Sequence, residues 1–155
     1  MRFHLIDRID SWESYRRISG RKVTAAAEDY WRRDQAGRLL MPPELILETV
    51  CQSATWLIML SSQCDKRAVL LSVDEVVCSG EVVPGDVLTI TATIESITTD
   101  AAVVDGFVDV DGRSVLRTAG IMCALLDAET LDTKESGERM ARQLLRTKDA
   151  RWPDV

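Results

Sequence analysis

Glu48 is an isolated charge in a strongly apolar part of the sequence. It is the only charged residue between Leu45 and Leu60, and burying a carboxylate is costly unless it is paired or hydrogen-bonded. Gln52 follows four positions later, a spacing that places both side chains on one face of a helix, where the amide can bond to the carboxyl group. We therefore predict that Glu48 is a general acid or base. The structural alternative is a carboxyl group satisfied at a subunit interface or a helix end.

Composition restricts the other chemistries. His4 is the only histidine, so a multi-histidine metal site is impossible, and a serine–histidine or cysteine–histidine pair would need that one residue. No two of the four cysteines have the spacing of a C-x-x-C motif, and we expect them to be reduced, mostly buried thiols. We predict neither a metal nor a cofactor.

The charge distribution favours a small acidic partner over nucleic acid. The net charge is −6, whereas phosphate binding needs clustered cations. Residues 1–40 nevertheless carry nine Lys and Arg against six Asp and Glu, which gives a local basic patch or an ordinary solvated face. The longest apolar stretch is too short to span a membrane. Because Asp7 follows the first apolar residues at once, we expect no signal peptide and a cytoplasmic location.

The residues around Glu48 predict a long buried helix. Pro42 and Pro43 are suited to a first helical turn, where the missing N–H of proline costs little. The segment Pro43–Ser61 that follows is apolar around most of its circumference, so the rest of the domain is expected to enclose it.

The second half of the chain predicts an antiparallel sheet. Residues 88–95 alternate between apolar and polar, as in a half-buried strand. Asp111-Gly112 is a strong hairpin signal, and Pro84-Gly85-Asp86 marks another turn. Near the start, Ser19-Gly20 is a plausible turn between two further strands. The fold class predicted is α+β, with four long strands and a strand pair rolled around one helix.

The last residues differ in character from the rest. We place the folded domain at residues 1–127 and a charged C-terminal tail at 128–155. Asp132 with Glu135 could cap a surface helix there, carrying a weak apolar stripe of Met140, Leu144 and Leu145. The tail either docks on the surface of the domain or binds a partner.

The central run of residues carries a family resemblance. In order, it comprises Glu28-Asp29-Tyr30-Trp31, Asp34, Gly37, Met41-Pro42, Leu45-Ile46-Leu47-Glu48 and Gln52. It resembles the 3-hydroxyacyl-acyl carrier protein dehydratases of the hotdog fold, whose motif is approximately E-x-F-F-x-G-H-F-P-x-x-P-x-M-P-G-V-L-I-x-E-A-x-A-Q. Val82-Val83-Pro84-Gly85-Asp86 is similar to the V-x-P-G-D turn of that family.

The resemblance implies a fold, an assembly and a substrate class. It implies a double-hotdog dimer in which two subunits share each site, with a histidine and a glutamate removing water from a (3R)-3-hydroxyacyl thioester. Glu48 occupies the position of that glutamate, and Gln52 that of the glutamine after it. The substrate-binding residues implied are Gln52, Tyr30, Trp31, Met41 and Pro43. The partner implied is acyl carrier protein or an acyl-CoA thioester.

Two positions depart from the family motif. Asp34 stands where the family has its histidine, and Pro43 stands where the motif has the glycine whose N–H polarises the thioester carbonyl. Proline has no N–H to donate. Asp34 either faces Glu48 across a dimer interface or forms an ion pair with Arg32, Arg33 or Arg38.

We therefore expect a relative of these dehydratases that binds acyl thioesters of fatty-acid or polyketide-type metabolism, with impaired dehydration. The alternatives are a hotdog thioesterase that uses Asp34 and Glu48, and a non-catalytic subunit. As a non-catalytic subunit, the chain would form a heterodimer with an active homologue instead of a homodimer.

Overall fold

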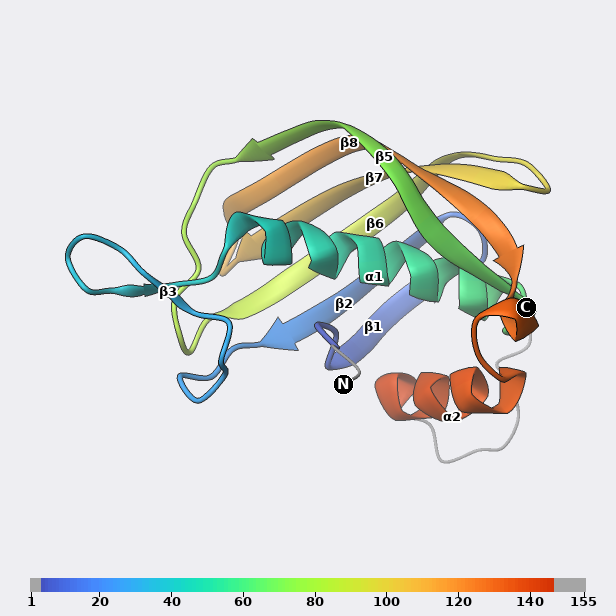
Figure 1. Cartoon of the computed structure of the whole chain (residues 1–155), viewed down its shortest axis with the longest axis horizontal. Coiled ribbons are helices and arrows are strands. Elements are labelled where there is room, and N and C mark those ends of the chain that lie inside the picture. The colour runs from blue at the N-terminus through green and yellow to red at the C-terminus, as the bar shows by residue number, and fades with distance from the viewer. Residues whose placement is uncertain (1–3, 147–155) are drawn as a thin grey trace.

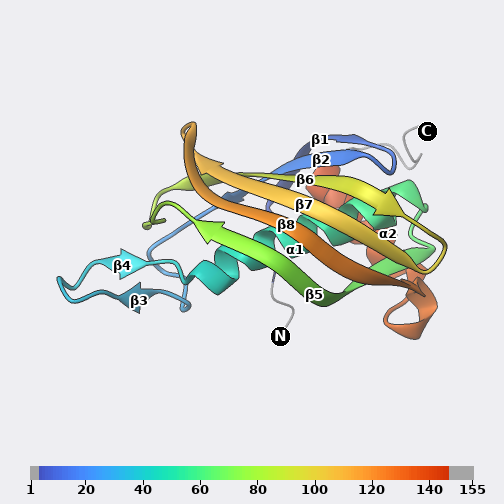
Figure 2. The same ribbon diagram turned by 90° about the horizontal axis from the view of Figure 1, so that it is seen from above.

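One antiparallel sheet curves around one long helix in the computed structural model, which describes residues 4–146 (Figure 1). The sheet has the strand order β1-β2-β6-β7-β8-β5. Its strands are β1 (Arg8–Glu13), β2 (Arg17–Val23), β5 (Lys66–Cys78), β6 (Val87–Ile97), β7 (Ala101–Val110) and β8 (Arg113–Asp127). The helix α1 (Pro43–Ser61) lies across one face of the sheet in both ribbon views (Figure 2). The predicted sheet-around-helix arrangement is confirmed.

The helix α1 has the predicted bounds and is enclosed as expected. Pro43 occupies its first turn, where a missing N–H costs little. Val50, Leu57 and Leu60 are fully buried. The helix approaches the sheet closely at Gly106, where an added Cβ would lie only 2.1 Å from Cγ1 of Val50. A glycine at this point of β7 thus lets the helix pack directly on the strand backbone.

The alternation of apolar and polar residues in the second half of the chain corresponds to the inner and outer faces of the sheet. Leu88, Ile90 and Ala92 of β6 are completely buried, so they form the inner face. Asp111 and Gly112 join β7 to β8 with φ of 51° and 78°, the left-handed conformation that two-residue hairpin turns require. The hairpin predicted from Asp-Gly is therefore confirmed.

The first strand connection was predicted at the wrong place. The chain turns at Ser14–Arg16, with Tyr15 at φ 53°, and Gly20 lies within β2 opposite Ile9. A Cβ on Gly20 would lie 2.8 Å from the carbonyl oxygen of Arg8. Gly20 therefore allows close contact between two strands. The local sequence Ser19-Gly20 is equally typical of a turn, so it does not distinguish the two uses.

The segment after the sheet forms a short 3-10 helix, η1 (Ala128–Thr130), and the helix α2 (Lys134–Leu145). The side chain of Thr133, and not that of Asp132, caps α2 by accepting a hydrogen bond from the N–H of Ser136. Ala141 and Leu144 are buried, so the predicted apolar stripe holds α2 against the domain beside β1 and α1 (Figure 1). Within the part described, no helix is long and apolar enough to span a membrane.

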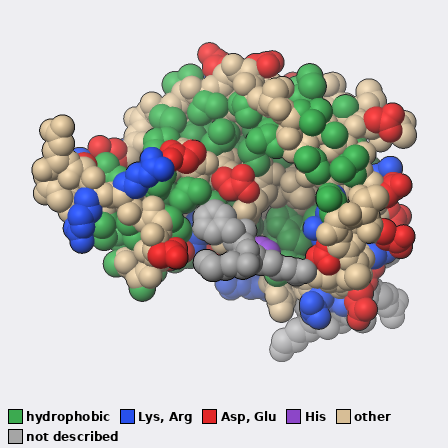
Figure 3. Space-filling view, viewed as in Figure 1, with side chains coloured by type: hydrophobic (Ala, Val, Ile, Leu, Met, Phe, Trp, Pro, Cys, Tyr) green, Lys and Arg blue, Asp and Glu red, His purple; other side chains and the backbone are tan. Residues whose placement is uncertain are grey.

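The edge strand β5 exposes an apolar surface. Leu71 is 60% exposed and Val77 48%, and Leu70, Val76, Met122 and Leu126 are exposed nearby. Figure 3 shows hydrophobic side chains gathered on this face over β5 and β8. An exposed apolar edge strand is a ready template for pairing with another chain, which is the geometry expected of a dimer joined through its sheets.

We predict that the protein dimerises through β5. Light scattering at micromolar concentration should give twice the chain mass of 17.3 kDa, and Leu71→Arg should shift the protein toward monomer because a charge would be buried at the interface. Leu131, 52% exposed but outside the sheet, provides the control, and Leu131→Arg should remain dimeric. A wild-type protein that is monomeric at this concentration would refute the prediction.

Candidate functional site

Glu48 is held by a hydrogen bond from the residue one turn further along α1. The side-chain amide of Gln52 donates from Nε2 to Oε1 of Glu48 at 3.0 Å. The Oε1 atom of Gln52 accepts a hydrogen bond from the backbone N–H of Leu5 at 2.8 Å. Because one amide bonds to both, Gln52 fixes the carboxyl group of Glu48 relative to the N-terminal segment. Glu48 is half-buried, and the hydrogen bond from Gln52 offsets part of the cost of withdrawing its carboxyl group from water.

A cavity of about 280 Å³ begins at Gln52 and extends along α1. Its apolar walls come mainly from α1 and α2, and its polar rim from the N-terminal segment, β5 and the turn before α2. The lining residues are His4, Gln52, Thr55, Trp56, Met59, Arg67, Asp132, Ser136, Gly137 and Met140. An apolar pocket with a few convergent polar groups is the usual form of a small-ligand site.

Asp34 lies in the loop of the two-stranded hairpin formed by β3 (Arg32–Arg33) and β4 (Leu39–Leu40). Its Oδ1 accepts from the backbone N–H groups of Ala36 and Arg38, both at 2.9 Å. Its Oδ2 accepts from Nε of Arg38 at 2.7 Å. The backbone N–H of Arg38, followed by its guanidinium group, holds the pKa of Asp34 below its ordinary value. Of the two possibilities for Asp34, the loop ion pair is the one present within a protomer.

The start of α1 offers little to polarise a carbonyl group. Pro43 has no N–H, and the N–H of Leu45 bonds to the carbonyl oxygen of Pro42 at 2.9 Å. Glu44 accepts a hydrogen bond from its own N–H, which lowers its pKa, and it also pairs with Arg32. A helix N-terminus normally presents free donors to an anion or a carbonyl. Here proline and local hydrogen bonds occupy those first positions.

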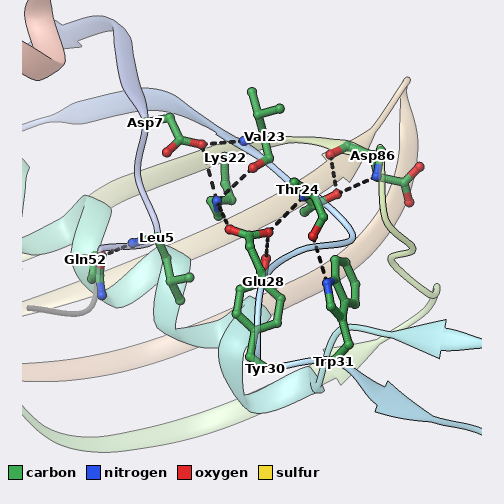
Figure 4. A network of polar contacts seen from close by, with 12 residues as sticks. Leu5, Asp7, Lys22, Val23, Thr24, Glu28, Tyr30, Trp31, Gln52 and Asp86 are labelled. Atoms are coloured by element: carbon green, nitrogen blue, oxygen red, sulfur yellow. Dashed lines mark hydrogen bonds and ion pairs between the residues drawn. The ribbon is translucent and has the colours of Figure 1, made fainter. Parts of the chain in front are cut away.

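Tyr30 and Trp31 belong to a loop that a buried ion pair holds in place. Glu28 accepts from Nζ of Lys22 at 2.6 Å and from the hydroxyl of Tyr30 at 2.5 Å, while Trp31 donates from Nε1 to the carbonyl oxygen of Ala25 (Figure 4). Lys22 is almost completely buried. Its Nζ also contacts the carbonyl oxygen of Val23 and the carboxylate of Asp7.

The predicted site residues fall into three groups. Glu48 and Gln52 are hydrogen-bonded to each other, and Gln52 opens onto the cavity beside α2. Asp34, Met41 and Pro43 line a second cavity of about 320 Å³ under the β3–β4 hairpin. Tyr30 and Trp31 pack against the core and line neither of these cavities. Within one protomer, the described residues do not bring Asp34 onto Glu48.

Sequence reasoning missed the ion pair of Lys22 and Glu28, and the contribution of α2 to the cavity. A signal for the first exists, because Lys22 stands at an inward position of an alternating strand, where a cation needs a partner. No motif marks the second.

Thiol chemistry is unfavourable at Cys51, the cysteine of α1. Burial and then the nearby charge of Glu48 raise the pKa of Cys51 to about 12, so the thiol stays protonated and is a poor nucleophile. All four cysteines are free, but Cys78 is exposed. The described residues contain no group of His, Cys, Asp and Glu side chains that could hold a metal ion.

Residues 1–119 match the family model of the FabA-like domain. The chain belongs to this family. It is 30% identical over 131 residues to the 3-hydroxyacyl-[acyl-carrier-protein] dehydratase FabZ of Anaeromyxobacter dehalogenans, covering 82% of this chain and 83% of that one. The predicted resemblance to the dehydratase family is therefore confirmed.

Solved structures confirm the hotdog fold of this FabA-like protein. A Streptococcus mutans protein bound to acetyl-CoA has a TM-score of 0.63 and 16% identity, covering 82% of this chain and 94% of its own. The dehydratase heterocomplex ApeI:P of Xenorhabdus doucetiae has a TM-score of 0.60 and 12% identity, over 80% and 82% of the two chains. At such identities the likeness concerns the fold alone.

We predict that Glu28→Gln destabilises the protein at neutral pH by about 3 kcal/mol, because it leaves Lys22 buried without its charged partner. Burial raises the pKa of Glu28, but the hydrogen bonds from Lys22 and Tyr30 outweigh it and place that pKa below its ordinary value. A depressed carboxyl pKa stabilises the fold above the unfolded-state pKa. Urea unfolding at pH 7 should therefore give a lower free energy of unfolding for Glu28→Gln than for wild type. This difference should disappear as the pH falls below about 4.

The control is Glu13→Gln, which removes the charge of an exposed ion pair with Arg16 and should change stability by less than about 1 kcal/mol. A Glu28→Gln protein as stable as wild type at pH 7 would contradict a structural role for this ion pair.

Proposed function

We propose that this protein binds acyl thioesters of fatty-acid or polyketide-type metabolism, carried on acyl carrier protein or coenzyme A, and that by itself it is a poor dehydratase. The observation that carries the proposal is the pair of Glu48 and Gln52. The amide of Gln52 holds the carboxyl group of Glu48 and also lines the apolar cavity along α1. A thioester placed beside Glu48 therefore has room for its acyl chain.

Asp34 is a weak substitute for a catalytic histidine. A general base works best when its pKa lies near the operating pH, whereas three hydrogen bonds hold the carboxylate of Asp34 and lower its pKa. Turning Asp34 toward a substrate would break its bonds to Arg38, which also pairs with Glu81. Asp34 thus serves the shape of the hairpin better than proton transfer.

The expected loss of rate is large. Removing a carbonyl-polarising donor typically costs about 10²–10³ in rate, and removing a general base costs about 10²–10⁴. The carbonyl-polarising donor is missing at the helix start, where Pro43 has no N–H. The general base is missing at the position of Asp34. The cavity that Gln52 lines is not affected by either change, so we expect binding to be retained while dehydration is slow.

A partner subunit could complete the site. A homologue that brings a histidine to the interface would face Glu48 of this chain, as the exposed edge of β5 allows a sheet-to-sheet dimer. A dehydratase heterocomplex exists among proteins of this fold, which supports a heterodimer as one form of the proposal.

Mass spectrometry of the products tests this function directly. Calorimetry should show that the wild-type protein binds both 3-hydroxyoctanoyl-CoA and octanoyl-CoA. Mass spectrometry should show that it forms the enoyl product far more slowly than an ordinary turnover of about 1–10³ per second. Release of free acid from octanoyl-CoA would instead show the thioesterase alternative. Failure to bind either thioester, on CoA or on acyl carrier protein, would reject the proposal.

We predict that Asp34→His combined with Pro43→Gly creates measurable dehydratase activity. The histidine supplies a side chain that titrates near neutrality, and the glycine restores an N–H at a helix N-terminus, where the helix dipole assists it. Each single change should do little, because groups that act as one catalytic unit are strongly non-additive. The readout is the rate of enoyl thioester formation.

The matched control is Asp34→Asn with Pro43→Gly, which keeps an acceptor for the hairpin N–H groups but supplies no base. It should remain inactive, and Glu48→Gln should abolish the activity gained. A folded double variant with histidine that binds octanoyl-CoA yet shows no gain would overturn this account of the missing groups.

A further inference from the structure

The cavity that begins at Gln52 follows one face of α1. Gln52, Trp56 and Met59 lie four, eight and eleven positions after Glu48, so they share its face of the helix, and all three line the cavity. At 1.5 Å per residue, the distance along the axis from Glu48 to Met59 is about 16 Å. From Gln52, which is hydrogen-bonded to Glu48, the cavity extends past Trp56 and Met59 toward the C-terminal end of α1.

The helix α2 closes the far side of this path. Gly137 and Met140 line the cavity opposite α1. An added Cβ on Gly137 would lie 2.9 Å from Cε of Met59 and 3.5 Å from Sγ of Cys64. The glycine lets α2 approach α1 closely, and Met140 projects into the remaining space. The family model ends at residue 119, so this wall lies outside the part of the chain that the model matches.

The size of the cavity limits what fits inside. Its volume is about 280 Å³, and a water-sized group occupies about 30 Å³. The cavity therefore holds about nine carbon-sized groups. Trp56, Met59 and Met140 supply apolar contact, and methionine side chains adapt readily to a flexible ligand.

We propose that α2 sets the acyl chain length that this protein accepts, with Gly137 and Met140 forming the end wall of a medium-chain acyl pocket. This inference rests on the proposed function, because it places the thioester at Glu48. It adds a specificity-determining element built from the C-terminal segment.

Binding of saturated acyl-CoA thioesters, from butanoyl to hexadecanoyl, tests the inference by calorimetry. In wild type the affinity should rise up to about fourfold for each buried methylene, and then stop rising near octanoyl or decanoyl. Met140→Trp fills the cavity and should weaken decanoyl-CoA by about tenfold while leaving butanoyl-CoA within about twofold. Met140→Ala lengthens the cavity and should move the tightest binding toward dodecanoyl.

The matched control is Arg139→Ala, an exposed neighbour on α2 that should leave the length profile unchanged. If Met140→Trp misfolds and binds no acyl-CoA of any length, the result for Met140→Ala decides the test. A shift of its tightest binding to longer chains supports the end wall. Profiles identical to wild type in Met140→Ala and in a folded Met140→Trp would overturn the inference alone. A wild-type protein that binds no thioester at all would overturn the proposed function as well.

Discussion

The hydrogen bonds of the Gln52 side chain constrain the whole candidate site. A carboxyl group on a helix that the domain encloses needs a donor, and Gln52 provides it from the next turn of the same helix. The other end of the amide accepts from the backbone of Leu5, so the chain segment before β1 is fixed against α1. The same side chain borders the cavity that leads to α2. The orientation of Glu48, the path of the N-terminal segment and the mouth of the cavity therefore depend on one amide.

Three carboxyl groups near this site have different environments. Glu28 neutralises buried Lys22 and holds the loop that carries Tyr30 and Trp31. Asp34 accepts hydrogen bonds within its own hairpin and pairs with Arg38. Only Glu48 combines partial burial with a neutral amide partner, so among the described residues its carboxyl group is not tied to a cation as the other two are. The family relationship extends over most of the chain, but these environments explain why the histidine position can hold an aspartate without disturbing the fold.

Local signals predicted most of the fold. Two prolines followed by a long apolar run predicted α1 with its observed bounds, and the two-residue alternation predicted β6. Local signals failed where a residue type has two uses. Gly20 serves close strand contact and not a turn, and Thr133 caps α2 although Asp132 is an equally good capping type. Contacts between distant residues were not predictable, because neither the pairing of Lys22 with Glu28 nor the cavity between α1 and α2 leaves a short motif. For Asp34 the sequence left two alternatives, and only the hydrogen bonds of its hairpin favour the ion pair.

We propose that Glu48 holds a thioester whose chain extends along α1 while Asp34 stays bound to its own hairpin. A crystal structure with octanoyl-CoA measures this most directly. It should show the thioester carbonyl beside Glu48, the acyl chain passing Gln52 and ending against α2, and Asp34 still bonded to Arg38. An acyl chain bound elsewhere, or Asp34 released from Arg38 and turned onto the thioester, would contradict the account.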